Sequence, residues 1–153
     1  MKKLFSFLAL ALCAVWGAAQ TELPHLEFMG VPIEGNITQF TKQMQPRYKL
    51  QKRVGGENYY IYKGPVCGHE MYLKADYSRK TRTVYKVTVT PKFIDQNAFL
   101  DSLTVRYGES ERTEKGYRWA FEPGEIFLYT PEGYDPVLIY IDRQGTMVMR
   151  EEK

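Results

Sequence analysis

The alternation of apolar and polar residues over two stretches, 66–77 and 82–90, most constrains what this chain can fold into. Successive side chains of a β-strand point to opposite faces, so a period of two predicts strands with one apolar face. Turn-sized segments at 63–66 and 78–81 border the first stretch, and the aromatic run 57–63 precedes it. Together they predict an antiparallel meander with one face in the core and the other toward solvent.

Two other segments have the period of an amphipathic helix. Apolar residues of 36–45 recur on one helical face, and Asn36 can cap the first turn. The segment 96–107 follows Asp95, a favourable N-cap. It ends at Gly108, which suits the left-handed conformation that closes many helices.

Strands are predicted again after the second helix, so each half of the chain has a helix followed by a β-meander. The halves, 26–91 and 92–153, suggest an internal repeat, because both contain an aromatic strand, a Gly/Pro turn and an apolar strand in that order. The predicted fold class is α+β, with helices packed on one face of an antiparallel sheet. The strands predicted for the second half are 117–121, 125–130, 137–142 and 146–151, the last two joined around Gly145.

Residues 1–19 have the layout of a secretory signal peptide, with two lysines, an apolar run and then small residues. The apolar run is too short to span a membrane. We expect cleavage after Ala19, which leaves 20–153 as a single α+β domain without a transmembrane segment, in the periplasm or outside the cell. Lipidation of Cys13 is not expected, because Leu12 stands where lipoprotein processing needs a small residue.

Removal of the signal peptide changes the charge and the cysteine content. It takes away Lys2 and Lys3 and no acidic residue, so the formal net charge falls from +3 to +1. A nearly neutral chain lacks the concentrated basic surface that nucleic-acid binding needs. Cys67 is then the only cysteine, so no intramolecular disulfide can form.

No segment has the residue spacing of a known catalytic motif or cofactor site. Cys67 and His69 would lie on one face of a strand among core residues, about 7 Å apart, which is long for a thiol–imidazole hydrogen bond. With Glu70 they offer too few converging ligands for zinc. His25 has no partner at helix or strand spacing, and the carboxylates of 109–114 are interpreted as a solvated loop. We therefore expect no enzyme, cofactor or metal.

Two short motifs carry a resemblance to known proteins. The chain has Gly-Val-Pro-Ile-Glu-Gly before the first helix, within 26–44, and a helix closing on Tyr-Gly, within 99–109. These motifs resemble a group of small secreted bacterial proteins of unknown function. The order of helix and meander is similar in architecture to the β-lactamase inhibitory protein and the SmpA-like outer-membrane assembly lipoproteins. The resemblance implies a tandem helix-plus-sheet fold without catalytic residues, although the inhibitor's paired cysteines and the lipoproteins' acylation cysteine are missing here.

The stretch 57–63 places three tyrosines within four positions. Alternation puts Tyr59 on the face opposite Tyr60 and Tyr62, so the three cannot line a single site. The basic residues before the Gly55-Gly56 turn are predicted to form a solvated edge that discourages edge-to-edge pairing. These residues are Lys49, Lys52 and Arg53.

The remaining signal is an excess of aromatic residues, with twelve tyrosines, eight phenylalanines and two tryptophans in the whole chain. Those on the uncovered sheet face either meet a partner or pair across strands. One hypothesis is an exported non-enzymatic protein that binds a protein or envelope component with this face. The alternative is a periplasmic carrier or sensor of a small apolar or aromatic ligand held between helix and sheet. The residues assigned to the uncovered face are Tyr72, Lys74, Lys86, Arg118, Phe127, Tyr129 and Tyr140.

Overall fold

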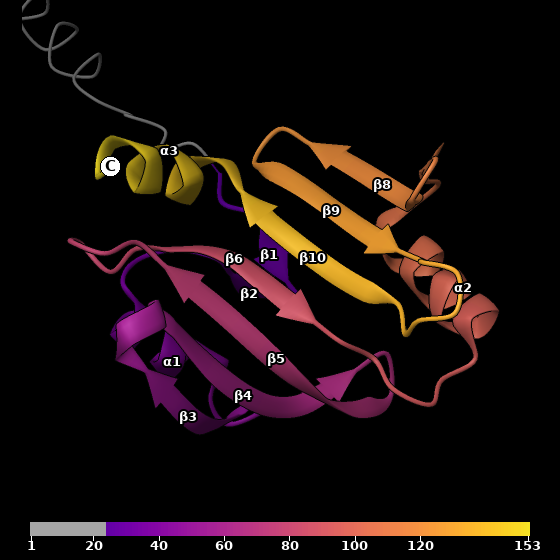
Figure 1. Cartoon of the computed structure of the whole chain (residues 1–153), viewed down its shortest axis with the longest axis horizontal. Helices are drawn as coiled ribbons and strands as arrows, with labels where there is room; N and C mark the ends of the chain where they lie inside the picture. Colours follow the sequence, from indigo (N-terminus) through magenta and orange to yellow (C-terminus); the bar gives the residue numbers. More distant parts are fainter. Residues whose placement is uncertain (1–23) are drawn as a thin grey trace, which may run out of the picture.

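The computed structural model describes residues 24–153, so the predicted signal peptide and Cys13 lie outside the described residues. The described chain has an α+β fold built on one large antiparallel sheet (Figure 1). Its eight strands are β3 (Lys49–Val54), β4 (Tyr59–Val66), β5 (His69–Tyr77), β6 (Val84–Val89), β7 (Glu111–Thr113), β8 (Gly116–Phe121), β9 (Gly124–Tyr129) and β10 (Val137–Asp142). They lie side by side in the order β3-β4-β5-β6-β10-β9-β8-β7.

Two helices and a short hairpin supply the core on one face of this sheet. The hairpin pairs β1 (Glu27–Phe28) with β2 (Val31–Pro32) and lies behind β6 and β10 in Figure 1. The helices are α1 (Ile37–Met44) and α2 (Gln96–Tyr107). Buried residues of the hairpin, of both helices and of the sheet belong to one hydrophobic core. The predicted α+β class with an antiparallel sheet is confirmed.

The predicted caps of α1 and α2 are present. Asn36 accepts hydrogen bonds from the backbone amides of Thr38 and Gln39, and the Gln39 side chain accepts one from the Asn36 amide. Asp95 accepts from the first amides of α2 at 2.9 and 3.1 Å. Gly108 closes α2 with a φ of 85°, which glycine adopts without strain. Such caps each contribute about 1 kcal/mol to helix stability.

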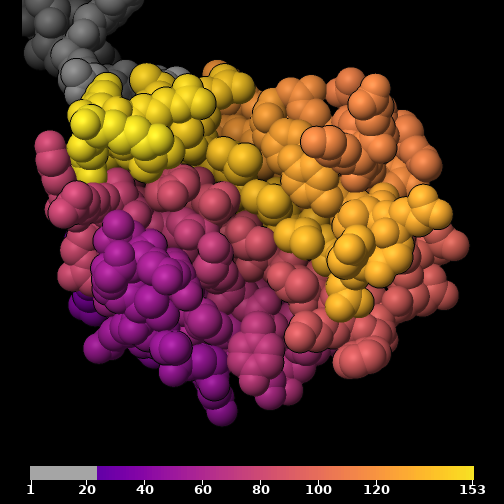
Figure 2. Space-filling view, in the orientation of Figure 1, coloured from indigo at the N-terminus to yellow at the C-terminus, as the bar shows by residue number. Residues whose placement is uncertain are grey.

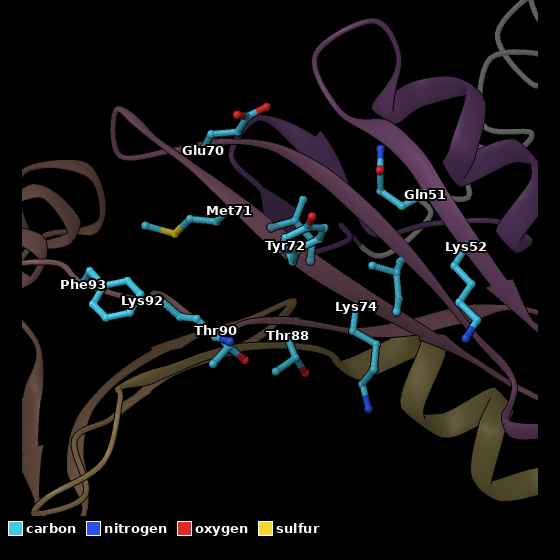
Figure 3. Close-up of a pocket in the computed structure, with 12 residues that line it drawn as sticks. Gln51, Lys52, Glu70, Met71, Tyr72, Lys74, Thr88, Thr90, Lys92 and Phe93 are labelled. Atoms are coloured by element: carbon cyan, nitrogen blue, oxygen red, sulfur yellow. The ribbon is translucent and has the colours of Figure 1, made fainter.

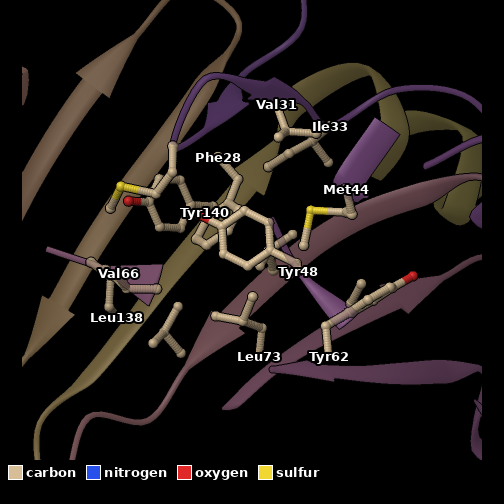
Figure 4. Packing of buried hydrophobic residues seen from close by; sticks show 14 of the residues in the cluster. Phe28, Val31, Ile33, Met44, Tyr48, Tyr62, Val66, Leu73, Leu138 and Tyr140 are labelled. Atoms are coloured by element: carbon tan, nitrogen blue, oxygen red, sulfur yellow. The ribbon is translucent and has the colours of Figure 1, made fainter. Parts of the chain in front are cut away.

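Aromatic side chains fill the centre of the core (Figure 4). The ring of Phe28 lies 5.4 Å from that of Tyr48 and 5.0 Å from that of Tyr140, measured between centroids. The Tyr48 hydroxyl donates to the Pro65 carbonyl oxygen at 2.9 Å, and the Tyr140 and Tyr107 hydroxyls are hydrogen-bonded at 2.8 Å. Burial of a polar group is tolerated when it keeps a hydrogen-bond partner. The region between helices and sheet is thus a packed core whose tyrosine hydroxyls are satisfied.

The prediction of a strand at 146–151 is wrong, because this segment belongs to the helix α3 (Arg143–Glu151). The Asp142 side chain caps α3 by accepting from the Gly145 amide at 2.8 Å. A strand could not follow here as a hairpin partner, since β10 already pairs with β6 on one edge and β9 on the other. Gly145 packs against β6, where a Cβ atom would collide with the Val84 carbonyl oxygen.

Two connections also differ from their predictions. The segment 63–66, expected as a turn, is the end of β4, and the turn follows at Cys67 and Gly68. The segment 109–114, whose carboxylates were expected in a loop, contains the short edge strand β7. Glu111 of this strand pairs with Arg118 of β8. In both places the strand runs closer to its hairpin turn than predicted, because Val66 pairs with His69 across Cys67-Gly68 and Thr113 pairs with Gly116 across residues 114–115.

Candidate functional site

The sheet face opposite the core, called the open face below, is covered by neither the hairpin nor α1 and α2. Figure 2 shows the molecule in the orientation of Figure 1, with the first half of the sheet in magenta and pink and the second half in orange and yellow. Register aligns side chains of consecutive strands in rows across this face. One such row is Lys74, Thr88, Ile139, Phe127 and Arg118.

Six of the seven residues assigned to the uncovered face lie on the open face. Residues next to them along the strands, such as Leu73 beside Tyr72 and Leu128 beside Phe127, point to the other face and are buried in the core. The opposite faces predicted for Tyr59 and Tyr60 are likewise confirmed, since Tyr60 is buried and Tyr59 is partly exposed. The six residues are Tyr72, Lys74, Lys86, Arg118, Phe127 and Tyr129.

The placement of Tyr140 on the open face is wrong. Its side chain is fully buried and pairs in register with Ile126 and Val87, two core residues. The predicted strand reads Val-Leu-Ile-Tyr-Ile, apolar or aromatic at every position, so alternation could not assign its faces. Desolvation by burial, with the Tyr107 hydroxyl beside it, raises the pKa of Tyr140 well above its ordinary value.

A groove of about 1040 Å³ lies on the first half of the open face (Figure 3). Its floor and walls come from β3, β4, β5 and β6, and the segment after β6 closes one end. Two aromatic side chains at this groove are exposed to solvent, Tyr72 at 58% and Phe93 completely. Phe93 also has a φ of 55°, uncommon for a bulky residue. The lining residues are Gln51, Lys52, Ile61, Glu70, Met71, Tyr72, Leu73, Lys74, Thr88, Thr90, Lys92 and Phe93.

The charge of the groove is positive. Lys52, Lys74 and Lys92 line it, against Glu70 as the single carboxylate of the lining. Glu70 is paired with Lys63, whose Nζ lies 3.5 Å from it. Among the residues that the structure describes, Lys52 and Lys92 form no ion pair. An anionic group entering the groove would therefore find lysines that no carboxylate neutralises.

Asp76 lies beside the groove and is almost completely buried on the open face. The Nζ atoms of Lys74 and Lys86 each lie 3.4 Å from one of its carboxylate oxygens. The oxygen facing Lys86 forms no hydrogen bond with any described group, so this contact is an ion pair without hydrogen-bond alignment. Lys74 also lies 5.0 Å from the centroid of the Tyr59 ring. Asp76 thus holds two lysines of the first half in place.

The second half of the open face carries a different group, called the Arg118 cluster and made of Arg118, Glu111, Glu125, Phe127 and Tyr129. Arg118 donates to Glu111 at 3.0 Å and also to Glu125. These hydrogen bonds, first that with Glu125, raise the pKa of Arg118. The rings of Phe127 and Tyr129 stack with centroids 5.8 Å apart and planes 12° apart. The cation of this cluster is neutralised within the protein.

The structure does not bring the two groups into one site. Between Lys74 of β5 and Phe127 of β9 stand β6 and β10, which contribute Thr88 and Ile139 to the row. Three strand spacings correspond to about 14 Å. Tyr72 and Lys74 line the groove, Lys86 lies beside it at Asp76, and the other three open-face residues belong to the Arg118 cluster.

The structure places Cys67 and His69 in different surroundings. Cys67 packs against the core at the turn between β4 and β5, whereas His69 is exposed, so its predicted core position is wrong. Desolvation raises the pKa of the Cys67 thiol, opposite to the change that activates a nucleophile. In the part of the chain that the structure describes, no group of three His, Cys, Asp or Glu residues could hold a metal ion.

His25 has a partner that sequence spacing could not indicate. Its Nδ1 lies 3.0 Å from Oδ2 of the fully buried Asp142, which also accepts from the Leu26 amide at 2.8 Å. The partners are separated by 117 residues, so no local pattern connects them. Asp142 therefore fastens the start of the described chain to the first turn of α3.

Comparisons with protein-family models, with curated proteins and with solved structures found no match to this chain. None of the helices between residues 24 and 153 has the length and hydrophobicity required to cross a membrane.

Proposed function

We propose that this chain is an exported, non-enzymatic binding protein that holds an acidic segment of another protein in the groove. The observation that carries the proposal is the exposure of Tyr72 and Phe93 in a groove where Lys52 and Lys92 form no ion pair with any described residue. Aromatic residues supply most of the binding energy of protein interfaces, because a partner desolvates a large rigid surface. Apolar surface left exposed and rimmed by charged residues is typical of an interaction site.

Charge complementarity favours an acidic partner over a basic or neutral one. Lys52, Lys74 and Lys92 line the groove, and the single carboxylate, Glu70, is already occupied by Lys63. The partner would place carboxylates near the lysines and an apolar or aromatic side chain against Tyr72 and Phe93. Opposite charges at such a rim raise association rates and suppress binding of basic partners.

A carrier of a small apolar or aromatic ligand is the second candidate function. The sequence hypothesis placed this ligand between helix and sheet, where Phe28, Tyr48 and Tyr140 are now seen to fill the core. A ligand of this class would use the groove instead, resting on the same two exposed rings. The groove volume of about 1040 Å³ is in the range of small-molecule sites.

Export and duplication belong to the same proposal. The layout of residues 1–19 supports export to the periplasm or beyond the cell. The element order supports an internal repeat, since α1 precedes the four strands β3–β6, α2 precedes the four strands β7–β10, and the last strands of the two halves pair at the centre of the sheet. This order also supports the architectural resemblance to the tandem inhibitory and assembly proteins.

The test is binding of a fluorescein-labelled peptide of alternating glutamate and phenylalanine residues, followed by fluorescence anisotropy at low ionic strength. The double variant Tyr72→Ala, Phe93→Ala should weaken binding about a hundredfold, because each ring acts as an interface anchor. Its thermal midpoint should change little, since both side chains are exposed. Tyr134→Ala is the matched control, because Tyr134 is 80% exposed and does not line the groove.

Two peptide controls define the chemistry of the partner. A peptide with lysine in place of glutamate should not bind, and one with serine in place of phenylalanine should bind weakly. Equal binding of the acidic and basic peptides, or unchanged binding by the double variant, would overturn the proposal. Binding of anilinonaphthalene sulfonate that depends on Tyr72 and Phe93, with no binding of either peptide, would establish the small-ligand carrier instead.

A further inference from the structure

We propose that a second pocket, between α1 and the hairpin β3–β4, binds a phosphate group through Arg53 and Arg82. The pocket has a volume of about 430 Å³ and lies apart from the groove, with no lining residue in common. It is lined by side chains from α1, β3, β4 and the turn between β5 and β6. It therefore adds a binding site to the proposed function and does not depend on it.

One tyrosine brings the two guanidinium groups together. Tyr60 is the cross-strand partner of Arg53, whose guanidinium carbon lies 5.7 Å from the centroid of the Tyr60 ring. An Arg82 guanidinium nitrogen donates to the Tyr60 hydroxyl at 2.8 Å. The Arg82 guanidinium carbon also lies 5.5 Å from the centroid of the Tyr77 ring, which packs edge-on against Tyr60. Both cations thus contact one nearly buried tyrosine, Arg53 over its ring and Arg82 at its hydroxyl.

No carboxylate neutralises these cations. The pocket lining contains Arg53, Arg82 and Lys42 together with threonine, glutamine and tyrosine, and no acidic residue. Over residues 24–153, none of the three cations forms an ion pair. Like charges held close together repel each other, so an anion that enters the pocket removes a repulsion and adds attraction.

The backbone at Arg82 is consistent with a binding role. Arg82 has a φ of 60°, in the left-handed region that arginine seldom adopts. The turn that carries it is held by Glu152, which accepts hydrogen bonds from the Lys80 and Thr81 amides at 2.6 and 3.0 Å. Such conformations persist where the surrounding contacts enforce them, often at ligand sites.

The chemistry of the lining selects the class of ligand. A guanidinium group presents paired N–H donors that match the oxygens of phosphate, and two of them with Lys42 offset the charge of a phosphate monoester. The Thr38 hydroxyl and the Gln45 amide add neutral polar groups at the pocket. A phosphate of this kind can belong to a small soluble molecule or to the headgroup of a membrane lipid.

Two probes separate these sources. Inorganic phosphate is titrated into the protein by isothermal calorimetry in a low-salt buffer without other multivalent anions. Vesicles of phosphatidylcholine, with and without phosphatidic acid, whose headgroup is a phosphate monoester, are sedimented with the same protein. The variant Arg53→Gln, Arg82→Gln should weaken binding of phosphate, or of the anionic vesicles, at least about tenfold, because each charge-assisted hydrogen bond contributes strongly.

Arg112→Gln is the matched control. Arg112 donates to the Tyr117 hydroxyl at 2.8 Å, as Arg82 does to Tyr60, but it does not line the pocket. Lys42→Gln tests the site without disturbing Tyr60 and should weaken binding by a smaller factor. Binding of neither probe, or binding equally sensitive to Arg112→Gln, would overturn the proposal. The peptide titrations of the groove would be unaffected by that result, because Arg53 and Arg82 do not line it.

Discussion

The groove and the Arg118 cluster occupy the two halves of one sheet face, yet their cations are in different electrostatic states. Arg118 is hydrogen-bonded to Glu111 and Glu125, one on each neighbouring strand. In the groove, Lys52 and Lys92 have no such partner among the described residues, and Lys74 shares Asp76 with Lys86. The groove on the first half therefore has two unpaired cations that can bind a ligand, whereas the cation of the Arg118 cluster is already paired with carboxylates of the protein.

This difference shows that alternation along a strand predicts the face on which a side chain lies, but not whether that face can bind a partner. Alternation assigned seven basic and aromatic residues to one face and treated them as one surface, and six of them lie there. Cross-strand register decides which cations face carboxylates. This ion pairing distinguishes a candidate binding surface, whose cations are unpaired, from a surface whose cations are neutralised by neighbouring carboxylates. The rings of Phe127 and Tyr129 stack along the single strand β9, so this pair packs within a strand and is not a pairing across strands.

The largest effect is expected from Tyr140→Ala, which removes a buried ring of β10 at the junction of the two halves. We expect a loss of about 3–5 kcal/mol in the free energy of unfolding, as for other large core aromatics. Urea denaturation should be followed by the fluorescence of Trp119, which reports on the second half, and by circular dichroism of the whole sheet. Non-coincident transitions would show that the halves unfold separately. Tyr140→Phe, which loses only the bond to Tyr107, should cost about 1 kcal/mol.

A smaller effect is expected when one carboxylate is neutralised in each half. Asp76→Asn should lower the unfolding free energy by about 1–2 kcal/mol, because Asp76 is nearly buried and its two lysines are partly screened by solvent. Glu125→Gln should cost less than Asp76→Asn, because the pair of Glu125 with Arg118 is more exposed to solvent. Asp76→Asn should also tighten binding of the acidic peptide, since it releases Lys74. Equal destabilisation by both variants, with unchanged peptide affinity, would remove the contrast between the halves.

The smallest effect concerns Glu152, which connects the end of α3 to the turn between β5 and β6. Partial burial favours the neutral acid, but hydrogen bonds from the Thr81 hydroxyl, the Lys80 and Thr81 amides and the Ser78 hydroxyl lower the pKa of Glu152 from 4.5 to about 2. A lowered pKa in the folded state means that stability is present above pH 4.5 and is lost as the pH falls toward 2.

Glu152→Gln should therefore reduce stability at neutral pH and flatten its dependence on pH between 4.5 and about 2. Thermal unfolding of both proteins across this range gives the measurement. Glu151→Gln is the control, because Glu151 is exposed and precedes the bonded residue. An identical pH profile for the wild type and Glu152→Gln would show that the turn is held by other contacts.

Local patterns in the sequence predicted the elements whose signals are local. The caps Asn36 and Asp95, the closing Gly108 and the alternation of β5 are all present in the structure. Prediction failed at α3, where Met147, Val148 and Met149 read as a short strand. In the structure Gly145 is buried and Val148, Met149 and Glu152 are partly buried, at the spacing of one helix face, whereas Met147 is exposed.

The sequence by itself determined the α+β class, two of the three helices of the described chain and the sheet face on which Tyr72, Lys74, Arg118, Phe127 and Tyr129 lie, because these depend on spacing along a few residues. Only the tertiary structure decided that β10 lies between β6 and β9, that Tyr140 is buried and that Asp142 holds His25. It also decided that Arg118 is neutralised, while Lys52 and Lys92 of the groove form no ion pair with any described residue. Each of these depends on partners brought together from distant parts of the chain, and the free energy that selects such pairings comes from burial and register across the whole sheet.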